Sequence, residues 1–373
     1  MSNADQTQLF LTILYIRAVR YDSCMDPITH AISGAALARA IPKHHLPAQQ
    51  LLFIILLTMA PDVDIILRLF SDTLYLQHHR GITHSILLIP LWGWLVYSLS
   101  SSRIKQNPSM PWLIGAALLL HISLDIITTF GTMILAPFSD WRASLDLLFI
   151  IDPFFTASML IPLLLGVIWK RQKRKMGLLS LLLMCSYLSL TYSNQQLAID
   201  LARQQQPNAK AYNALPMAFS PYHWQLIAIY PDHYARAAIN LKPDFSGSKS
   251  LFDKTFVTNL LSTQMHDPDA IVWQTLPAMH TVKHLTSFPG TAFYDWFARY
   301  PVLLEQNDKQ TTFGDLAFGG GAPGVRPAFQ LQINLEDRTE GDISEKQPTH
   351  AWLIWRNDHK SKLDPTSPPF SWF

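Results

Sequence analysis

Apolar positions dominate the first half of the chain, and this pattern stops near residue 193. The longest apolar runs cover 51–60, 82–99, 112–130, 145–169 and 177–192. A helix needs about 20 residues to cross the hydrocarbon core of a bilayer, so three of these runs are long enough or nearly so. The run before Pro61 is short, and we read it as tilted, re-entrant or extended back to about residue 47. The pattern predicts an α-helical membrane domain of about four or five hydrophobic helices.

From residue 194 the pattern becomes that of an ordinary soluble domain. Polar glutamines along 194–211 predict a helix that leaves the membrane. Alternating or β-branched and aromatic positions predict strands, and one segment predicts a helix. The predicted strands are 223–230, 270–273, 328–335 and 351–355, and the predicted helix is 288–300. We therefore expect a soluble α+β domain with a small, mostly antiparallel sheet and a poorly ordered proline-rich tail after residue 364.

These patterns divide the chain into three parts. Residues 1–24 form an N-terminal extension whose status is left open, because Met25 directly precedes the first polar motif and could be the native start. Residues 25–193 form the transmembrane domain, and residues 194–373 form the α+β domain.

Lysine and arginine in the short loops predict the orientation. The basic loop at 170–175, the pair Arg103 and Lys105, and the pair Arg39 and Lys43 all fall on one side of the predicted spans. This side should be cytoplasmic. We expect a multi-pass protein of the cell inner membrane whose α+β domain is extracytoplasmic, in the periplasm or outside the cell.

Composition agrees with a membrane protein and excludes one class of partner. Only 15% of the residues are charged, against about 25% in typical soluble domains. The formal net charge is +2, and no basic stripe is interleaved with aromatic residues, so nucleic-acid binding has no electrostatic support. The two cysteines, Cys24 and Cys185, give no disulfide framework.

Four motifs of metal-ligand type lie in or beside the apolar runs. They read Asp-Pro-Ile-Thr-His at 26–30, Pro-Asp-Val-Asp at 61–64, His-His-Arg-Gly-Ile-Thr-His-Ser at 78–85 and His-Ile-Ser-Leu-Asp at 121–125. Ionisable side chains at membrane depth are costly and usually mark a functional site. Imidazole and carboxylate are ligands of zinc and similar ions. A shared metal centre is the simplest account of all four motifs.

Each motif also has a structural reading. His121 and Asp125 share a helix face at i, i+4 spacing, where they could bind one ion or form a hydrogen-bonded pair between helices. Asp62 and Asp64 could both point inward from a turn, or one of them could cap a short helix at 65–70.

The motif at 78–85 is the most specific of the four. Gly81 permits a positive φ, and His79 and His84 on either side of it could converge on one ion. Arg80 could bind a phosphate or carboxylate in bidentate fashion. The alternative is a polar interfacial loop in which Thr83 or Ser85 caps the following helix.

The remaining acidic positions look like helix starts. Asp26 precedes Pro27 as an N-cap would, and His30 follows in the first turn as a ligand or as an incidental histidine. Asp146 and Asp152 could orient the histidines or act as boundary residues and caps.

The four motifs, in this order among hydrophobic helices, resemble the bacterial membrane-bound predicted metal-dependent hydrolases of the YdjM/YbcI type. The resemblance covers about residues 25–193. It implies an inner-membrane protein with a divalent metal site and hydrolytic activity. The positions that match the family's motifs are His30, Asp62, Asp64, His79, His84, His121 and Asp125. A fainter similarity to zinc-dependent phospholipases and related nucleases, which also use a His-x3-Asp helix pair, indicates phosphodiester chemistry.

We therefore expect a metal-dependent hydrolase that holds one or two divalent ions, zinc first and manganese as the alternative. The strongest expected ligands are His79, His84, His121 and Asp125, and the residues expected to complete a second metal site are Asp62, Asp64 and His30. Asp64 is the expected general base if it is not a ligand, and Arg80 is expected to hold a phosphate oxygen.

The membrane setting favours a phospholipid or lipid-linked substrate. The competing hypothesis is a non-enzymatic transporter or metal-binding membrane scaffold. The oligomeric state is left open.

Overall fold

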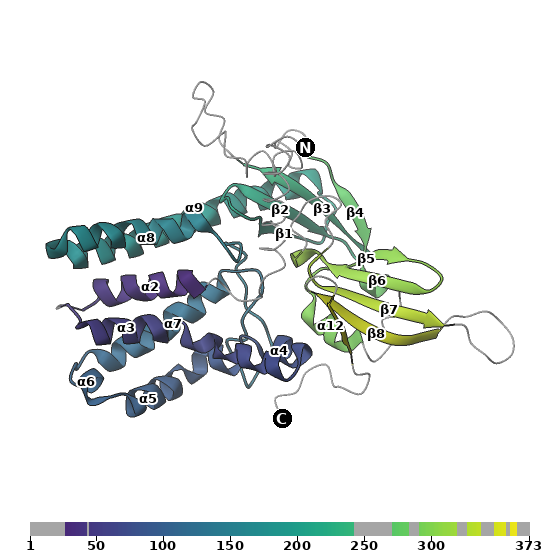
Figure 1. Cartoon of the computed structure of the whole chain (residues 1–373). Helices are drawn as coiled ribbons and strands as arrows, with labels where there is room; N and C mark the ends of the chain where they lie inside the picture. The colour runs from purple at the N-terminus through teal and green to yellow at the C-terminus, as the bar shows by residue number, and fades with distance from the viewer. Residues whose placement is uncertain are drawn as a thin grey trace, which may run out of the picture. The chain divides into compact units, whose positions relative to one another are not determined.

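The computed structural model (Figure 1) divides into two compact units. One unit is Ser23–Ser193, and the other contains Asn194–Phe373. The structure describes residues 27–42, 45–241, 271–282, 291–318, 327–336, 347–355 and 359–363. The expectations for Met25, for the Asp26 cap and for the tail after residue 364 lie outside these residues.

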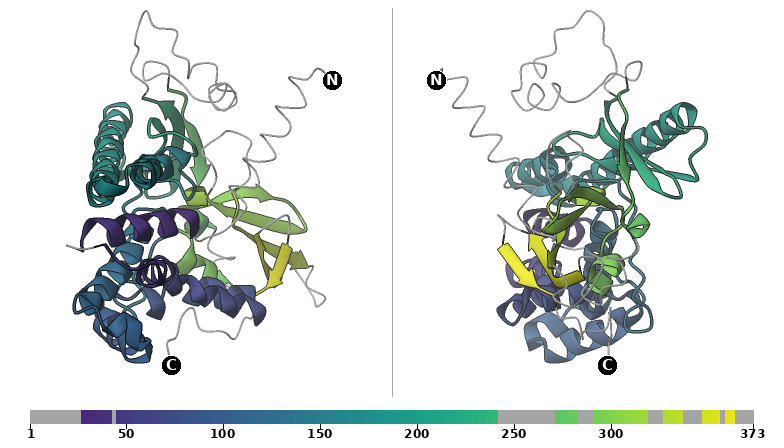
Figure 2. Two further views of the ribbon diagram at one scale, coloured as in Figure 1. Left: turned by 60° about the vertical axis from the view of Figure 1, so that its left-hand side comes forward. Right: turned by 90° about the vertical axis from the view of Figure 1, so that its right-hand side faces the viewer.

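The described part of the first unit is helical apart from its loops and isolated bridges, and the longest connection is the segment 127–152 between α7 and α8. Its helices are α2 (Pro27–Ala40), α3 (Ala48–Leu57), η1 (Ala60–Leu69), α4 (Asp72–His78), η2 (Ile82–His84), η3 (Ile86–Leu88), α5 (Ile89–Leu99), α6 (Ser102–Lys105), α7 (Met110–Ile126), α8 (Pro153–Ile168), η4 (Lys170–Gln172) and the first part of α9 (Lys173–Gln205). Helix α2 packs against α3, α7 and α8 (Figure 2). The core between α2, α3 and α7 is formed by Leu37, Ile54, Ile114 and Ala117.

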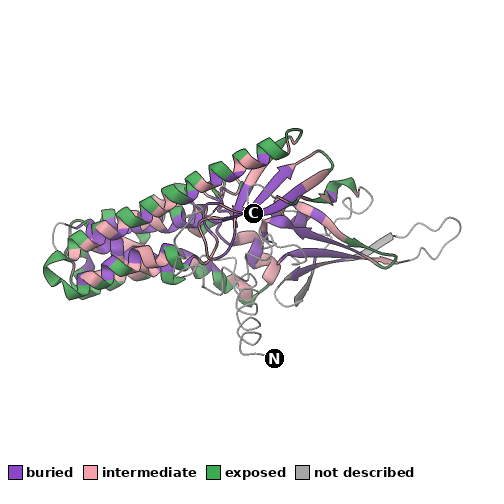
Figure 3. Ribbon diagram, turned by 90° about the horizontal axis from the view of Figure 1, so that it is seen from above, coloured by how far each residue is buried: buried purple, intermediate pink, exposed green. Residues whose placement is uncertain are grey.

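The outer faces of these helices are apolar as well as the core. Trp112 is 84% exposed, Leu69 81% and Leu99 79%. Figure 3 shows buried residues between the helices and exposed ones along their outer sides. Apolar side chains that face outward along several helices are expected where the solvent is lipid rather than water.

Among the described residues, helix 170–205 is long and apolar enough to cross a membrane by itself. Two helix pairs pass the same test only together, Ala48–Leu57 with Ala60–Leu69, bent by 51°, and Asp72–His84 with Ile86–Leu99, bent by 46°. Helices α7 and α8 are apolar but shorter. The described part therefore contains one to three candidate spans, and the expected four or five crossings stay a prediction.

The run at 82–99 is not the continuous helix that hydropathy predicts. The chain is extended at Ser85, where the Ile86 amide donates to the carbonyl of Ile134, and regular helix begins only at Ile89. Pro90 lies at the start of α5, where its missing amide hydrogen costs nothing. Hydropathy does not detect such a break because the residues on both sides are equally apolar.

A close approach between α2 and the end of α3 occurs at Gly34. A Cβ at this position would lie 2.2 Å from Thr58 Oγ1 and 3.0 Å from Thr58 Cγ2. Rotating the threonine would break the hydrogen bonds that its hydroxyl donates to the carbonyls of His30 and Ile55. Only glycine therefore fits without displacing the threonine.

Gly34→Ala is expected to lower the free energy of unfolding by about 1–3 kcal/mol through overpacking. Thermal unfolding in detergent measures this change. The matched control is Gly115→Ala in α7, where nothing lies within 4 Å of the new methyl group. Alanine gains up to about 1 kcal/mol over glycine in a helix interior, so the control should be neutral or stabilising. Equal responses of the two variants would contradict the close packing at Gly34.

The second unit begins with the end of α9 and continues in two antiparallel sheets. Ala198 and Ala202 of α9 pack on the first sheet together with Trp224 and Ile239. The first sheet has the order β1-β2-β3-β4 and the second the order β5-β6-β7-β8-β9. The strands are β1 (Ala211–Pro216), β2 (His223–Ile229), β3 (His233–Asn240), β4 (Gln274–Pro277), β5 (Pro301–Gln306), β6 (Gln310–Asp315), β7 (Gln330–Glu336), β8 (Gln347–Trp355) and β9 (His359–Lys362), and a short helix, α12 (Ala292–Phe297), precedes β5.

The strands predicted at 223–230, 328–335 and 351–355 are confirmed as β2, β7 and β8. The strand predicted at 270–273 is wrong, because β4 is Gln274–Pro277. Residues 271 and 273 instead pack against α9, and Trp273 Nε1 donates to Gln205 Oε1. The expected single small sheet is replaced by two sheets.

Candidate metal centre

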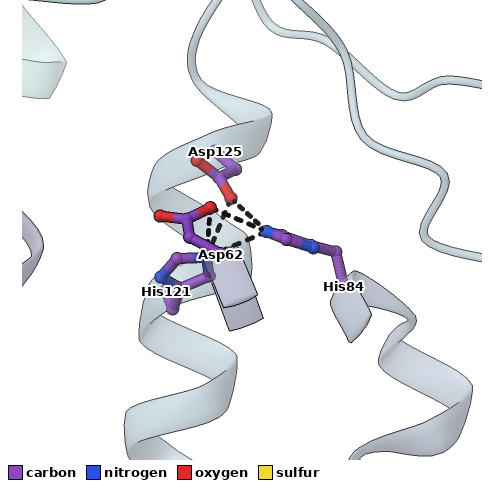
Figure 4. Close-up of side chains that lie close together, drawn as sticks. All are labelled: Asp62, His84, His121 and Asp125. Carbon is purple, nitrogen blue, oxygen red and sulfur yellow. Dashed lines mark hydrogen bonds and ion pairs between the residues drawn. The ribbon is translucent and has the colours of Figure 1, made fainter. Parts of the chain in front are cut away.

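Four side chains from three separate segments of the first unit converge on one point. Asp62 comes from η1, His84 from η2, and His121 and Asp125 from α7 (Figure 4). Each offers one ligand atom, and these four atoms all lie within 4.8 Å of one another. A cluster of this kind could bind a metal ion.

The separations between the facing atoms are short and nearly uniform. The two histidine Nε2 atoms are 3.0 Å apart, and each lies 3.1 Å from Asp125 Oδ2. Asp62 Oδ1 is 3.4 Å from Nε2 of His84 and 3.6 Å from Nε2 of His121. The four groups therefore surround a common point.

Hydrogen bonds on the far side of each imidazole orient both rings. His121 Nδ1 lies 2.7 Å from the carbonyl oxygen of Thr58. Since a carbonyl only accepts, Nδ1 is the donor, and the lone pair of Nε2 is directed at the cluster. His84 Nδ1 lies 2.9 Å from Thr83 Oγ1, so its Nε2 is directed in the same way. Metal-binding histidines usually have their second nitrogen bonded in this manner.

The carboxylates of the cluster are short of hydrogen bonds. Asp125 is fully buried, and neither of its oxygens has a hydrogen-bond partner among the described residues, although Oδ1 forms an ion pair with Arg80. Asp62 Oδ1 is likewise buried and has no hydrogen-bond partner there. Buried carboxylate oxygens that accept no hydrogen bond are costly, and a cation between these two side chains would satisfy them. The donor set therefore fits a metal ion.

His30 lies beside the cluster but is not one of the four. Its ring stacks on His121 with the centroids 4.0 Å apart, and its Nε2 is 3.5 Å from Asp125 Oδ1. The side chain is fully buried, and neither ring nitrogen has a hydrogen-bond partner among the described residues. It is close enough to assist Asp125, on the side away from His84.

Asp64 and His79 bind each other next to the cluster. Asp64 Oδ1 is 3.0 Å from His79 Nδ1, and Asp64 Oδ2 accepts from the Arg80 amide at 2.9 Å and from the Thr83 hydroxyl at 3.3 Å. These two residues, expected as ligands, therefore lie among hydrogen bonds that surround the four converging groups.

Arg80 is directed into the protein. Its side chain is fully buried, with Nη2 2.8 Å from Asp125 Oδ1 and Nη1 bonded to the carbonyl of Asp125 and the hydroxyl of Thr128. The expected positive φ belongs to this residue, at 57°, and not to Gly81, whose φ is −96°. In this left-handed conformation the Arg80 amide donates to Asp64 Oδ2, and the guanidinium forms an ion pair with Asp125 Oδ1.

The structure decides several of the capping alternatives. Neither Asp62 nor Asp64 caps a helix, because η1 begins at Ala60 and its N-cap, Met59, makes no side-chain bond. The proposed Thr83 or Ser85 caps are also wrong, because neither 3-10 helix there has a side-chain cap. Asp152 does cap α8, accepting from the amides of Phe154 and Phe155.

Asp146 accepts a hydrogen bond from Ser144.

Sequence reasoning missed two groups that support the site, the carbonyl of Thr58, which bonds His121, and the hydroxyl of Thr128, which bonds Arg80. No sequence motif signals a backbone oxygen or a lone threonine.

Comparisons with known proteins find similar sequences for the helical unit. Residues 25–198 match the family described as YdjM inner membrane protein. "Uncharacterized protein YfhP" of Bacillus subtilis (strain 168) is 31% identical over 138 residues, which cover 36% of this chain and 39% of that protein. The match therefore spans about two fifths of the relative's length. No solved structure matches. The segment that carries the four motifs, residues 25–198, is therefore similar to the YdjM inner membrane protein family.

Proposed function

We propose that this protein is a membrane-embedded metal-dependent hydrolase whose ion is held by Asp62, His84, His121 and Asp125. The observation that carries the proposal is the convergence of these four ligand atoms within 4.8 Å of one another. A tetrahedral site with ligands at 2.0–2.1 Å has edges of roughly 3.3 Å. Five of the six separations between these atoms are 3.0–3.6 Å, which fits such a site. Two imidazoles and two carboxylates favour zinc, with manganese as the alternative.

A divalent ion in such a site supplies Lewis acidity and lowers the pKa of water to about 7. The protein supplies orientation and access. The Asp62 side chain is 16% exposed, whereas those of the other three residues are fully buried. Water and substrate therefore reach the cluster from the Asp62 side.

Asp62 is also the better proton acceptor. Asp64, the acceptor expected from the sequence, already has both oxygens engaged by His79, the Arg80 amide and Thr83. Asp62, in contrast, is the most exposed carboxylate side chain of the cluster.

An apolar groove on the face of α2 that is turned away from the cluster supports an amphiphilic substrate. It has a volume of about 410 Å³ and runs along α2 toward α8 and the end of α3. Its lining includes Ile28, Ala31, Ala35, Leu160 and Leu164. His30 lies on the opposite, buried face of α2, so one helix separates the groove from the cluster. An acyl chain of a phospholipid or lipid-linked substrate matches this chemistry.

A second candidate function is ion transport, and one observation favours it. Each of the two bent helix pairs contributes to the cluster, with Asp62 just after one bend and His84 just before the other. Membrane transporters place their ion sites at such discontinuous helices. The same geometry also suits an enzyme, because irregular backbone is tolerated at membrane depth where it is buried in protein.

Chelation distinguishes the two functions. The full chain purified in detergent is expected to contain bound zinc or manganese and to hydrolyse a phosphodiester or carboxylic ester of a long-chain phospholipid. Stripping the ion should lower turnover by at least ~100-fold, and adding it back should restore turnover. A short-chain analogue, which leaves the groove empty, is the matched control and should react more slowly. If the protein has full metal occupancy and no turnover, and if it conducts ions across vesicle membranes, the hydrolase hypothesis is wrong and the transporter hypothesis is supported.

A further inference from the structure

We infer that the centre holds a single divalent cation, and that Asp64 is a positioning residue for it and not a ligand of a second ion. The inference rests on the proposed metal site and adds the number of ions and the role of the surrounding carboxylate. It depends on the buried charge, on the bonds already made by Asp64, and on the extent of the ligand cluster.

The buried charge balances for one ion. The contacting side chains of the centre include three carboxylates, Asp62, Asp64 and Asp125, and one guanidinium, Arg80, which leave a net charge of −2 with the histidines neutral. One divalent cation brings this sum to zero. A second would leave a charge of +2 among side chains that are almost completely buried. Uncompensated buried charge is strongly unfavourable.

Both oxygens of Asp64 are already engaged by neighbouring groups. Its Oδ1 is 3.0 Å from His79 Nδ1, and its Oδ2 accepts hydrogen bonds from the Arg80 amide and the Thr83 hydroxyl. Within the described ranges, the group of possible ligand atoms that converges contains neither Asp64 nor His79. A second ion at Asp64 would have to compete with these hydrogen bonds.

The bonds of Asp64 lead instead to a ligand of the first ion. His84 Nδ1 donates to Thr83 Oγ1 at 2.9 Å, and the Thr83 hydroxyl donates to Asp64 Oδ2 at 3.3 Å. Asp64 Oδ2 is itself 3.6 Å from His84 Nδ1. The relay from histidine through threonine to carboxylate fixes the ring so that Nε2 points at the cluster, 3.1 Å from Asp125 Oδ2. Partners of this kind typically contribute 10–100-fold to metal affinity.

The first measurement is the number of zinc or manganese ions per chain at saturation, by elemental analysis of the full chain in detergent. The expected value is one. Two ions per chain would overturn the inference and leave the proposed hydrolase intact. No bound ion would overturn both.

The second measurement is zinc affinity by competition with a chelator. Asp64→Asn and Thr83→Val are each expected to keep a stoichiometry of one and to weaken affinity by about 10–100-fold. Thr83→Ser, which keeps the hydroxyl, should restore wild-type affinity. A merely structural role would not produce this rescue.

The matched control for the affinity series is Ser85→Ala, on the other side of His84. Within the part of the chain that the structure describes, the hydroxyl of the buried Ser85 donates to the carbonyl of Ile134 at 3.4 Å. Its affinity should stay within about twofold of wild type. Wild-type affinity in both Asp64→Asn and Thr83→Val would overturn the positioning role, and loss of one of two ions in Asp64→Asn would identify Asp64 as a ligand.

Discussion

Asp125→Asn is expected to reduce metal affinity by more than ~100-fold and hydrolysis to background. The lower bound is the loss typical of residues that only support a ligand, and Asp125 is itself a proposed ligand. Its Oδ2 lies 3.1 Å from both ligand imidazoles, and its Oδ1 lies on Arg80 and His30. The amide keeps the shape of the side chain but removes its charge, which leaves the Arg80 guanidinium buried without an ionic partner.

Competition with a chelator and turnover on the same preparation test this prediction. The matched control is Asp200→Asn, an exposed carboxylate on α9 that pairs with the exposed Arg203. The control should bind and turn over like the wild type. Wild-type affinity in Asp125→Asn would remove Asp125 from the ligand set and, with it, the geometry on which the proposed function depends.

Arg80→Leu is expected to lower the free energy of unfolding of the metal-free protein by about 3–5 kcal/mol, since breaking a buried ion pair leaves its partner unpaired. The variant removes the 2.8 Å contact with Asp125 Oδ1 and the bonds to the Asp125 carbonyl and to Thr128. Measuring after chelation removes the contribution of the bound ion to stability. Thermal unfolding in detergent is the measurement.

The matched control is Arg103→Leu, an exposed arginine bonded to Gln49, which should change stability by less than about 0.5 kcal/mol. The double variant Arg80→Met with Asp125→Leu removes both charges and should recover part of the loss. If Arg80 held a substrate phosphate instead, Arg80→Leu would raise KM and leave the unfolding transition in place.

The convergence of the motifs could be predicted from the sequence. Which residue of each motif points into the cluster, and which one supports a ligand, could not. His121 and Asp125 share a face of α7 because of their i, i+4 spacing. Asp62 and Asp64 stand two residues apart, and their roles depend on how the 3-10 helix η1 is wound. The tertiary structure directs Asp62 at the cluster and Asp64 at His79.

The same limit applies to the fold. Strands β2 and β8 carry aromatic and β-branched residues and β7 alternates polar and apolar positions, so these three were predictable, whereas β3 is rich in alanine. Such strands form because neighbouring strands offer hydrogen-bonding partners on both sides. In the helical unit, hydropathy identified the apolar segments but not the bends at residues 58–59 and 85.

Helix η1 has the reverse of the side-chain arrangement found on a helix at the surface of a water-soluble protein. Asp64 is buried on its inner side, while Val63, Ile66 and Leu69 are 60%, 54% and 81% exposed. If hydrocarbon surrounds the unit, η1 has lipid on its outer side and the acidic groups on its inner side, and no further helix needs to be crossed between them. A change in bilayer thickness or in lipid packing would therefore act directly on the backbone that carries Asp62, without first passing through the rest of the helical unit.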